Sequence, residues 1–489
     1  MRFLKLTILA FFIAFSAACF LLSDKKLSIK NAPKNPQAFF THHAQTFQKA
    51  NPENIKGDFE CENSFEFGAV KAAMTKNGAD FFIAFETKGQ KETYQIEAVV
   101  GTKKIEEYIA RKDTKLLRLP IAYDLSQKRW INLSSAFFEA DDKDFFKHQK
   151  DWNAECASCH LENASTNLEN FDVKNLSSDE VLLACGACHA KGLTDSFPKF
   201  DEIVSKEKYS GAVILAHQNR AQNPADFFED GSVRLAAHEY QGILRSVCFV
   251  KSKAGGQELG GEKINCLSCH SIENGNIDVK TDEKLLNFQA CTNCHQQFSA
   301  PASIAEHTKH STASQASSCY SCHMPEVVYG HLQFQKTHKI SIPNPELTVQ
   351  KSVPNACNLC HTDKSVNWAI LQTKSLWTQH FRDAKTSSDT QFDEAEGIRG
   401  LFAGDALTRA LTADALKKHG TPKWFAPFVL KAAQDENYSL VRYFLENALA
   451  ENKNLPKPQD ISPKTENQVS ITAQKLRSRR KKNDLEIAE

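Results

Sequence analysis

The chain has 489 residues, which is enough for two or three domains, and a formal net charge of +1. This balance of charge gives no sign of nucleic acid as a partner. Hydrophobic residues make up 41% of the chain, which is slightly low for this length, and 15 cysteines are unusual. A cofactor that supplies part of the core would account for the modest hydrophobic fraction.

The N-terminus is typical of an export signal. Arg2 and Lys5 flank the start of a nearly continuous apolar run from Leu6 to Leu22, and small residues stand before Cys19. The run is marginal for a spanning helix, which needs about 20 apolar residues. Residues 1–23 are therefore expected to be a cleaved signal peptide, an uncleaved membrane anchor or a lipoprotein signal lipidated at Cys19. The structural alternative is a buried N-terminal helix.

The next two regions differ in their patterning. Residues 24–56 are polar and are expected to be an extended segment. Residues 57–150 are predicted to form a small antiparallel β unit, because Tyr94–Val100 alternates apolar and polar residues with the period of a half-buried strand. Phe81–Phe85 and Leu117–Tyr123 are further candidate strands.

The remainder of the chain changes character twice. Over residues 151–378 regular periodicity fades and Cys, His, Asn and Ser become frequent, so a conventional core is not expected there. Residues 395–453 are predicted to be helical, since apolar residues in Val441–Leu449 share one helix face. These short helices resemble a HEAT-like or tetratricopeptide-like module. The tail, residues 454–489, is polar and basic and is expected to be solvated and disordered.

Six Cys-x-x-Cys-His motifs lie in the region 151–378 and use twelve of the cysteines. Two thiols three residues apart on a helical turn can form thioethers with both vinyl groups of one porphyrin, and the histidine that follows can bind its iron. The motifs predict six covalently attached c-type haems. They are Cys156/Cys159/His160, Cys185/Cys188/His189, Cys266/Cys269/His270, Cys291/Cys294/His295, Cys319/Cys322/His323 and Cys357/Cys360/His361.

Other uses of paired cysteines explain the pattern less well. Zinc sites and redox dithiols also use Cys-x-x-Cys pairs. Zinc does not require a histidine directly after every second cysteine, and a redox dithiol would occur once rather than six times. Disulfides in an oxidising compartment would leave the histidines unexplained.

The second axial ligand of each iron is expected to be histidine. Methionine occurs only at Met1, Met74 and Met324, too few for six irons, whereas eleven of the 17 histidines lie outside the motifs. Histidine on both sides of the iron favours low-potential haems. Any single histidine can instead be an ordinary surface or core residue. The candidate distal ligands are His42, His43, His217, His238, His307, His310 and His338.

Three cysteines remain outside the motifs: Cys19, Cys61 and Cys248. An exported compartment permits a disulfide between Cys61 and Cys248. Two separate buried thiols are the alternative.

The segment Ile264–Trp377 resembles exported multihaem cytochromes with C-terminal helical repeats, of the octahaem nitrite-reductase-like and hydroxylamine-oxidoreductase-like group. The resemblance extends upstream through the β unit and covers most of residues 40–377. It implies a haem-organised fold, mostly α and irregular, with an N-terminal antiparallel β unit and a C-terminal helical module. The matching stretches are Asn265–His270, Cys319–Pro325, His338 with Ile342–Pro345, Pro354–His361, Trp152–His160, Asp230–Gly231 and Tyr240–Cys248.

The chain also departs from that family, whose members usually have eight haem motifs. No motif precedes the pair His42–His43, and a motif expected between His160 and Cys185 is missing. The chain therefore resembles a six-haem derivative. By this resemblance, distal ligands are expected at His42 or His43, His310 and His338, and His307 matches less closely.

Three functions remain open at the level of sequence. Electron transfer through closely spaced haems is favoured, because irons with two histidine ligands cannot bind substrate. A reductase or oxidase of a small nitrogen or sulfur compound needs one open iron; related nitrite reductases use a motif that ends in Lys, and none occurs here. A scaffold that docks partners through the C-terminal helices is the third.

The expected partners are redox proteins or a quinol-linked membrane complex. Attachment to the membrane through the N-terminus is one option. The expected location is the periplasm or outside the cytoplasmic membrane.

Overall fold

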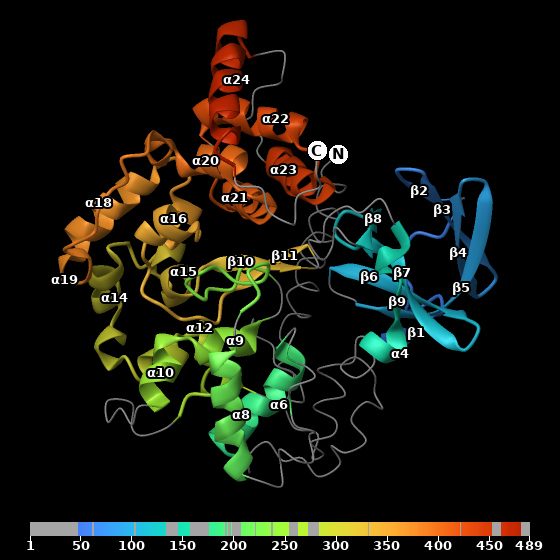
Figure 1. Cartoon of the computed structure of the whole chain (residues 1–489), viewed down its shortest axis with the longest axis horizontal. Coiled ribbons are helices and arrows are strands. Elements are labelled where there is room, and N and C mark those ends of the chain that lie inside the picture. The colour runs from blue at the N-terminus through green and yellow to red at the C-terminus, as the bar shows by residue number, and fades with distance from the viewer. Residues whose placement is uncertain are drawn as a thin grey trace, which may run out of the picture.

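A computed structural model of the chain has a β sheet at one end and helices at the other, with a region of short helices beside them (Figure 1). The structure describes residues 47–60, 63–101, 104–133, 145–156, 176–190, 193, 197, 207–220, 222–235, 238–253, 263–271, 283–330, 332–420, 422–451 and 461–480. The expected export signal, His42, His43 and Cys61 lie outside these residues, as do Cys159 and His160 of the first motif. No helix within them is long and apolar enough to cross a membrane.

The N-terminal unit is an antiparallel meander, as the alternating pattern predicted. Neighbouring strands pair in chain order from β2 to β8, while β1 pairs with β5 and β9 with β7. The sheet therefore begins at Phe47, earlier than expected. Lys88 and Gly89 form a two-residue turn with φ of 51° and 78°, the left-handed conformation that tight hairpins need. The strands are β1 Phe47–Lys49, β2 Asn63–Phe67, β3 Val70–Asn77, β4 Asp80–Thr87, β5 Gln90–Val100, β6 Ile105–Lys112, β7 Lys115–Asp124, β8 Arg129–Asn132 and β9 Lys150–Asp151.

The middle region consists of short helices and one hairpin. Its hairpin, β10 Glu326–Gly330 with β11 Gln333–Lys336, was not expected from the sequence. The helices are α4 Trp152–Glu155, α6 Ser178–His189, α8 Glu207–Asn219, α9 Glu239–Leu244, α10 Val247–Lys253, α11 Cys266–Cys269, α12 Glu283–Leu286, α13 Gln289–Thr292, α14 Pro301–Thr308, α15 Cys319–His323, α16 Glu346–Lys351, α17 Ala356–Cys360, α18 Val366–Leu376 and α19 Thr378–Phe381. Short 3-10 turns are η1 Phe145–His148, η5 Gln296–Phe298, η6 Gln315–Ser317 and η7 Thr390–Asp393.

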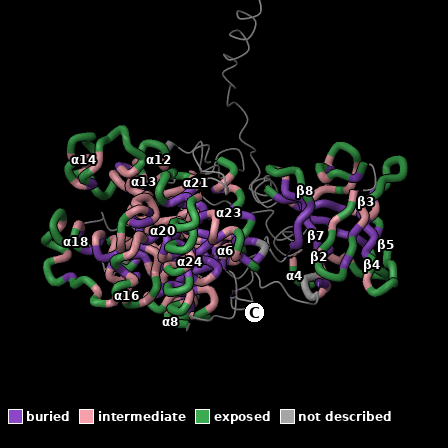
Figure 2. Tube along the Cα trace, turned by 90° about the horizontal axis from the view of Figure 1, so that it is seen from above, coloured by how far each residue is buried: buried purple, intermediate pink, exposed green. Residues whose placement is uncertain are grey.

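This middle region has almost no apolar core of its own. Among the described residues between Phe249 and Ala356, Val328 alone is a buried hydrophobic side chain. Figure 2 shows the contrast: buried positions crowd the strands and the helices around α20 and α21, whereas α12 to α14 are mostly exposed or intermediate. The expectation that protein atoms alone do not build a conventional core there agrees with this distribution.

The C-terminal module packs helices around one apolar cluster, as the helical pattern predicted. Its helices are α20 Glu396–Ala403, α21 Ala406–His419, α22 Ala426–Asp435, α23 Ser439–Glu451 and α24 Pro463–Arg477, with the 3-10 turn η8 Lys423–Phe425. The prediction of a solvated tail is wrong for α24. Val469, Ala473 and Leu476 recur on one face and are buried in the module.

The helical module also contacts the β unit. The Tyr443 hydroxyl of α23 donates to the Asp124 carboxylate of β7 at 2.9 Å, and Arg129 lies over the Tyr443 ring at 4.8 Å. Leu332, at the tip of the β10–β11 hairpin, packs against apolar clusters of both units. The middle region therefore contacts both the β unit and the helical module.

Candidate functional site

Each motif that the structure describes in full sits on a short helix or at its end. Motif cysteines begin and end α11, and α15 runs from the first cysteine to the histidine of its motif. Asparagine caps two of these helices: the side chains of Asn265 and Asn355 accept hydrogen bonds from the backbone of the first turn. In such a turn, residues three apart lie on the same helix face, so both thiols face the same side.

Three motif histidines each lie beside a histidine from outside the motifs. The distances between ring centroids are 6.1 Å for His270 and His338, 6.0 Å for His307 and His323, and 6.2 Å for His310 and His361. Each pair joins one motif histidine to one candidate distal ligand. Among the described residues, the structure thus brings together three of the five candidate distal histidines with three of the five motif histidines.

This spacing fits two imidazoles that share one iron. A histidine nitrogen binds a metal at about 2 Å, so two of them on opposite sides lie about 4 Å apart. Each ring centroid lies roughly 1.2 Å behind its nitrogen, which gives about 6.4 Å between centroids. Ordinary aromatic pairs span about 4.5–7 Å, so the distance alone is not diagnostic. The constant pairing of a motif histidine with a histidine from elsewhere is the stronger observation.

Helix α14 and the residues that follow its end supply two of the outside histidines. His307 lies in its last turn, where the Trp377 indole donates to the His307 carbonyl at 2.8 Å. Lys309 then adopts a left-handed conformation with φ of 58°, which ends the helix before His310. One helix end thereby presents neighbouring histidines to two different motifs.

For two of these histidines, hydrogen bonds show which ring nitrogen remains available to bind a metal. His323 Nδ1 lies 2.9 Å from the Ser341 carbonyl oxygen, and His310 Nδ1 lies 2.6 Å from that of Thr308. A carbonyl only accepts, so Nδ1 carries the proton and Nε2 keeps its lone pair for a metal. No sequence pattern indicates these carbonyl partners, because any residue type can supply one.

Burial keeps the paired histidines neutral. Desolvation lowers the pKa of His307, His338 and His361 below the ordinary value, with the neighbouring histidines as a further cause for His307 and His361. A neutral imidazole is the form that binds a metal. These three rings are therefore in the ligand form at neutral pH.

The first cysteines of two pairs of consecutive motifs interact. The Cys185 thiol of the second motif hydrogen-bonds to Cys266 of the third, and Cys291 of the fourth hydrogen-bonds to Cys319 of the fifth. The bond from Cys291 lowers the pKa of the Cys319 thiol to about 7. Groups attached at the two motifs of each pair would accordingly be neighbours.

Two of the predicted haem-binding cysteines do not lie in an enclosed site. Cys188 and Cys294, each the second cysteine of its motif, are exposed, whereas the other described motif cysteines are half-buried. The reason is local: Cys188 stands in the last turn of α6, and Cys294 follows the end of α13. Protein atoms alone therefore do not enclose these two thiols. A thioether needs no such wall, because the covalent bond itself holds the haem, so their role in attachment stays a prediction.

Large apolar side chains are exposed mainly around the motifs. Among the described residues, seven of the nine exposed large hydrophobics fall between residues 215 and 376. Haem is a large apolar group that such side chains could cover. The paired histidines, the attachment thiols and this apolar surface fit covalently bound haem. The seven are Leu215, Val247, Val250, Leu286, Ile342, Leu371 and Leu376.

Other predicted site residues have different surroundings. The buried His217 hydrogen-bonds through Nδ1 to the Tyr240 hydroxyl at 2.9 Å. The buried His238 packs on Phe227 and lies 3.8 Å from the Asp226 carboxylate. Neither contact involves a motif histidine. Cys248 carries a free thiol.

The two remaining described motif histidines also differ from the pairs. His189 Nδ1 lies 3.5 Å from the Glu239 carboxylate, a partner that the sequence analysis missed. His295 lies near Phe298, with 6.5 Å between ring centroids.

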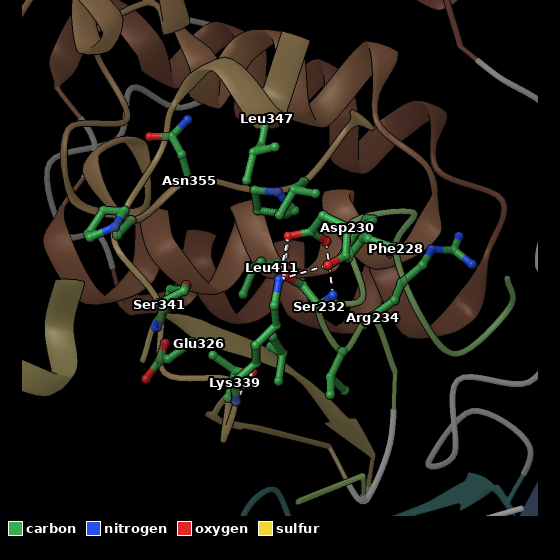
Figure 3. A pocket seen from close by; sticks show the side chains of 18 of the residues that line it. Phe228, Asp230, Ser232, Arg234, Glu326, Lys339, Ser341, Leu347, Asn355 and Leu411 are labelled. Carbon is green, nitrogen blue, oxygen red and sulfur yellow. Dashed lines mark hydrogen bonds and ion pairs between the residues drawn. The ribbon is translucent and has the colours of Figure 1, made fainter. Parts of the chain in front are cut away.

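A pocket lies behind the fifth motif (Figure 3). Cys322 and Ser341 line it, together with Lys339, whose ammonium group lies 2.7 Å from the Asp230 carboxylate and 3.1 Å from the Ser232 hydroxyl. Arg234, also in its wall, pairs with Asp405 at 2.6 Å. The bonds of Lys339 anchor the segment that carries both His338 and Ser341 to Asp230 and Ser232, and Arg234 ties the neighbouring segment of the chain to the helical module through Asp405.

Among the described residues, no group of three or more His, Cys, Asp or Glu side chains is arranged to hold a metal ion. Comparison of the chain with protein-family models, curated proteins and solved structures finds no match. Its candidate function therefore depends on the residues themselves.

Proposed function

We propose that the chain is an exported multihaem c-type cytochrome that carries six covalent haems and transfers electrons through them. The observation that carries this proposal is the set of three histidine pairs, each with one member in a Cys-x-x-Cys-His motif and ring centroids 6.0 to 6.2 Å apart. Haem bound between two histidines exchanges single electrons as its iron changes between the ferric and ferrous states.

The residues of the chain have distinct roles in this proposal. Motif cysteines form the thioethers, and motif histidines bind iron from the proximal side. His307, His310 and His338 bind from the distal side and exclude substrate from those irons. The contacts Cys185–Cys266 and Cys291–Cys319 set consecutive attachment points side by side. Such close placement favours electron passage along the chain of motifs.

Export belongs to the same proposal, because thioether attachment of haem and the N-terminal signal both point to the periplasm or the outer side of the cytoplasmic membrane. Redox proteins or a quinol-linked membrane complex would supply and remove the electrons. The family resemblance to octahaem cytochromes supports this assignment only by analogy.

The alternative is a reductase or oxidase of a small nitrogen or sulfur compound. Such an enzyme needs one iron with an open distal position. His295 is the motif histidine to examine, because the ring beside it is that of Phe298, which cannot ligate iron.

One experiment separates these proposals. The protein, produced with cytochrome c maturation machinery, is analysed by intact mass, pyridine haemochrome and low-temperature EPR of the oxidised sample. Six haems with only low-spin signals support an electron conduit. Six haems with one high-spin iron favour the enzyme, and a chain without covalent haem would refute both.

A further inference from the structure

Helix α9 lies between two of the candidate iron sites. It packs against α6, which carries the second motif, and a Cβ at Gly186 would lie 2.5 Å from the Tyr240 ring. On the other side, a Cβ at Gly242 would lie 3.1 Å from the backbone of His338. Two glycines thus allow α9 to approach both sites closely.

The first residue of α9, Glu239, contributes a negative charge at this place. Its carboxylate lies 3.5 Å from His189 Nδ1, and its side chain is 19% exposed. That oxygen, Oε2, is buried and has no hydrogen-bond partner among the described residues, so it is available to accept from His189 Nδ1 when the ring binds iron through Nε2. A carboxylate at this place adds a negative charge beside the His189 ring.

The fifth motif offers a contrast within the same chain. There the Nδ1 of His323 meets a neutral acceptor, the Ser341 carbonyl, at 2.9 Å. A carboxylate partner makes a histidine ligand more basic than a carbonyl partner does. A negative charge near an iron also stabilises its more positive, ferric state.

We propose that Glu239 lowers the reduction potential of the iron held at His189, relative to the iron held at His323 and His307. This inference rests on the proposed function. It assigns direction to the electron path, because electrons would flow from the second motif toward the fifth.

The test is a spectroelectrochemical titration of the intact cytochrome and of Glu239→Gln. The variant should raise one midpoint potential by about tenfold in the reduction equilibrium constant, which is about 59 mV for one electron. The other potentials should not move. Glu239→Asp, which keeps the charge, should restore most of the difference.

Glu180→Gln is the matched control. Glu180 is a buried carboxylate on the same helix as His189, and glutamine also completes the capping box with Ser177. It lies nine residues before His189, about 13 Å along the helix axis.

Unchanged potentials in Glu239→Gln, or equal shifts in Glu180→Gln, would overturn the proposal. So would loss of haem from both Glu239→Gln and Glu239→Asp, because the residue would then serve packing alone. A wild-type chain without six haems by intact mass would instead refute the proposed function, so the two failures are distinguishable.

Discussion

Removal of His307 is the sharpest test of the proposed ligand pairs. The His307 ring lies 6.0 Å from that of His323, and the two ring planes differ by only 5°. His307→Ala leaves the distal side of one iron without a ligand, while the Ser341 carbonyl still holds His323 Nδ1. One iron of the six, about a sixth of the total, should therefore become high-spin and bind carbon monoxide.

The fold should survive this change. Trp377 donates to the backbone carbonyl of residue 307, which alanine keeps. Truncation loses the contact with the Phe298 ring at 4.4 Å, at a cost of about 1 kcal/mol.

The assay is EPR of the oxidised protein together with carbon monoxide titration of the reduced protein, each compared with wild type. His380→Ala is the control, because His380 is exposed on α19 and close enough to His307 to influence its charge, yet it is no candidate ligand. One additional high-spin iron in His307→Ala alone supports the pair. No increase, or the same increase in His380→Ala, would refute the ligand role.

Three further outcomes are expected. Replacement of both Cys319 and Cys322 by Ala should remove one haem from the intact mass, and a haem count that stays the same would mean that the fifth motif does not attach haem. Gly186→Ala should lower the free energy of unfolding by about 1–3 kcal/mol, because its Cβ would overlap a ring at 2.5 Å; Gly211→Ala, whose Cβ would have its nearest neighbour at 3.5 Å, should not be destabilising. Burial raises the pKa of Asp230, but hydrogen bonds from Lys339 and Ser232 and the positive charge of Lys339 outweigh burial. Together they lower the pKa of Asp230 below the ordinary 3.8. The stability that Asp230 contributes is therefore present above pH 3.8 and is lost as the pH falls through its pKa in the folded protein. The melting temperature of Asp230→Asn should therefore fall less steeply in acid than that of the wild-type protein.

Local patterns predicted much of the fold. The alternation in Tyr94–Val100 predicted β5, and the apolar face in Val441–Leu449 predicted α23, because both periods are set by backbone geometry. The same reasoning applied to α24 would have identified Val469, Ala473 and Leu476 as a helix face. The polar and basic composition hid that face, and only packing on the helical module shows that it is buried.

The candidate site likewise has features that follow from local sequence and features that depend on tertiary contacts. The sequence by itself determined the Cys-x-x-Cys-His motifs, because two cysteines and a histidine within five residues meet on one turn whatever the rest of the chain does. The pairs His270–His338, His307–His323 and His310–His361 depend on the tertiary structure, since their members come from separate segments. The carboxylate of Glu239 beside His189 is also a tertiary contact, made where α9 packs on α6. A residue type states what a side chain can bind, and only the packing of distant segments decides what it meets.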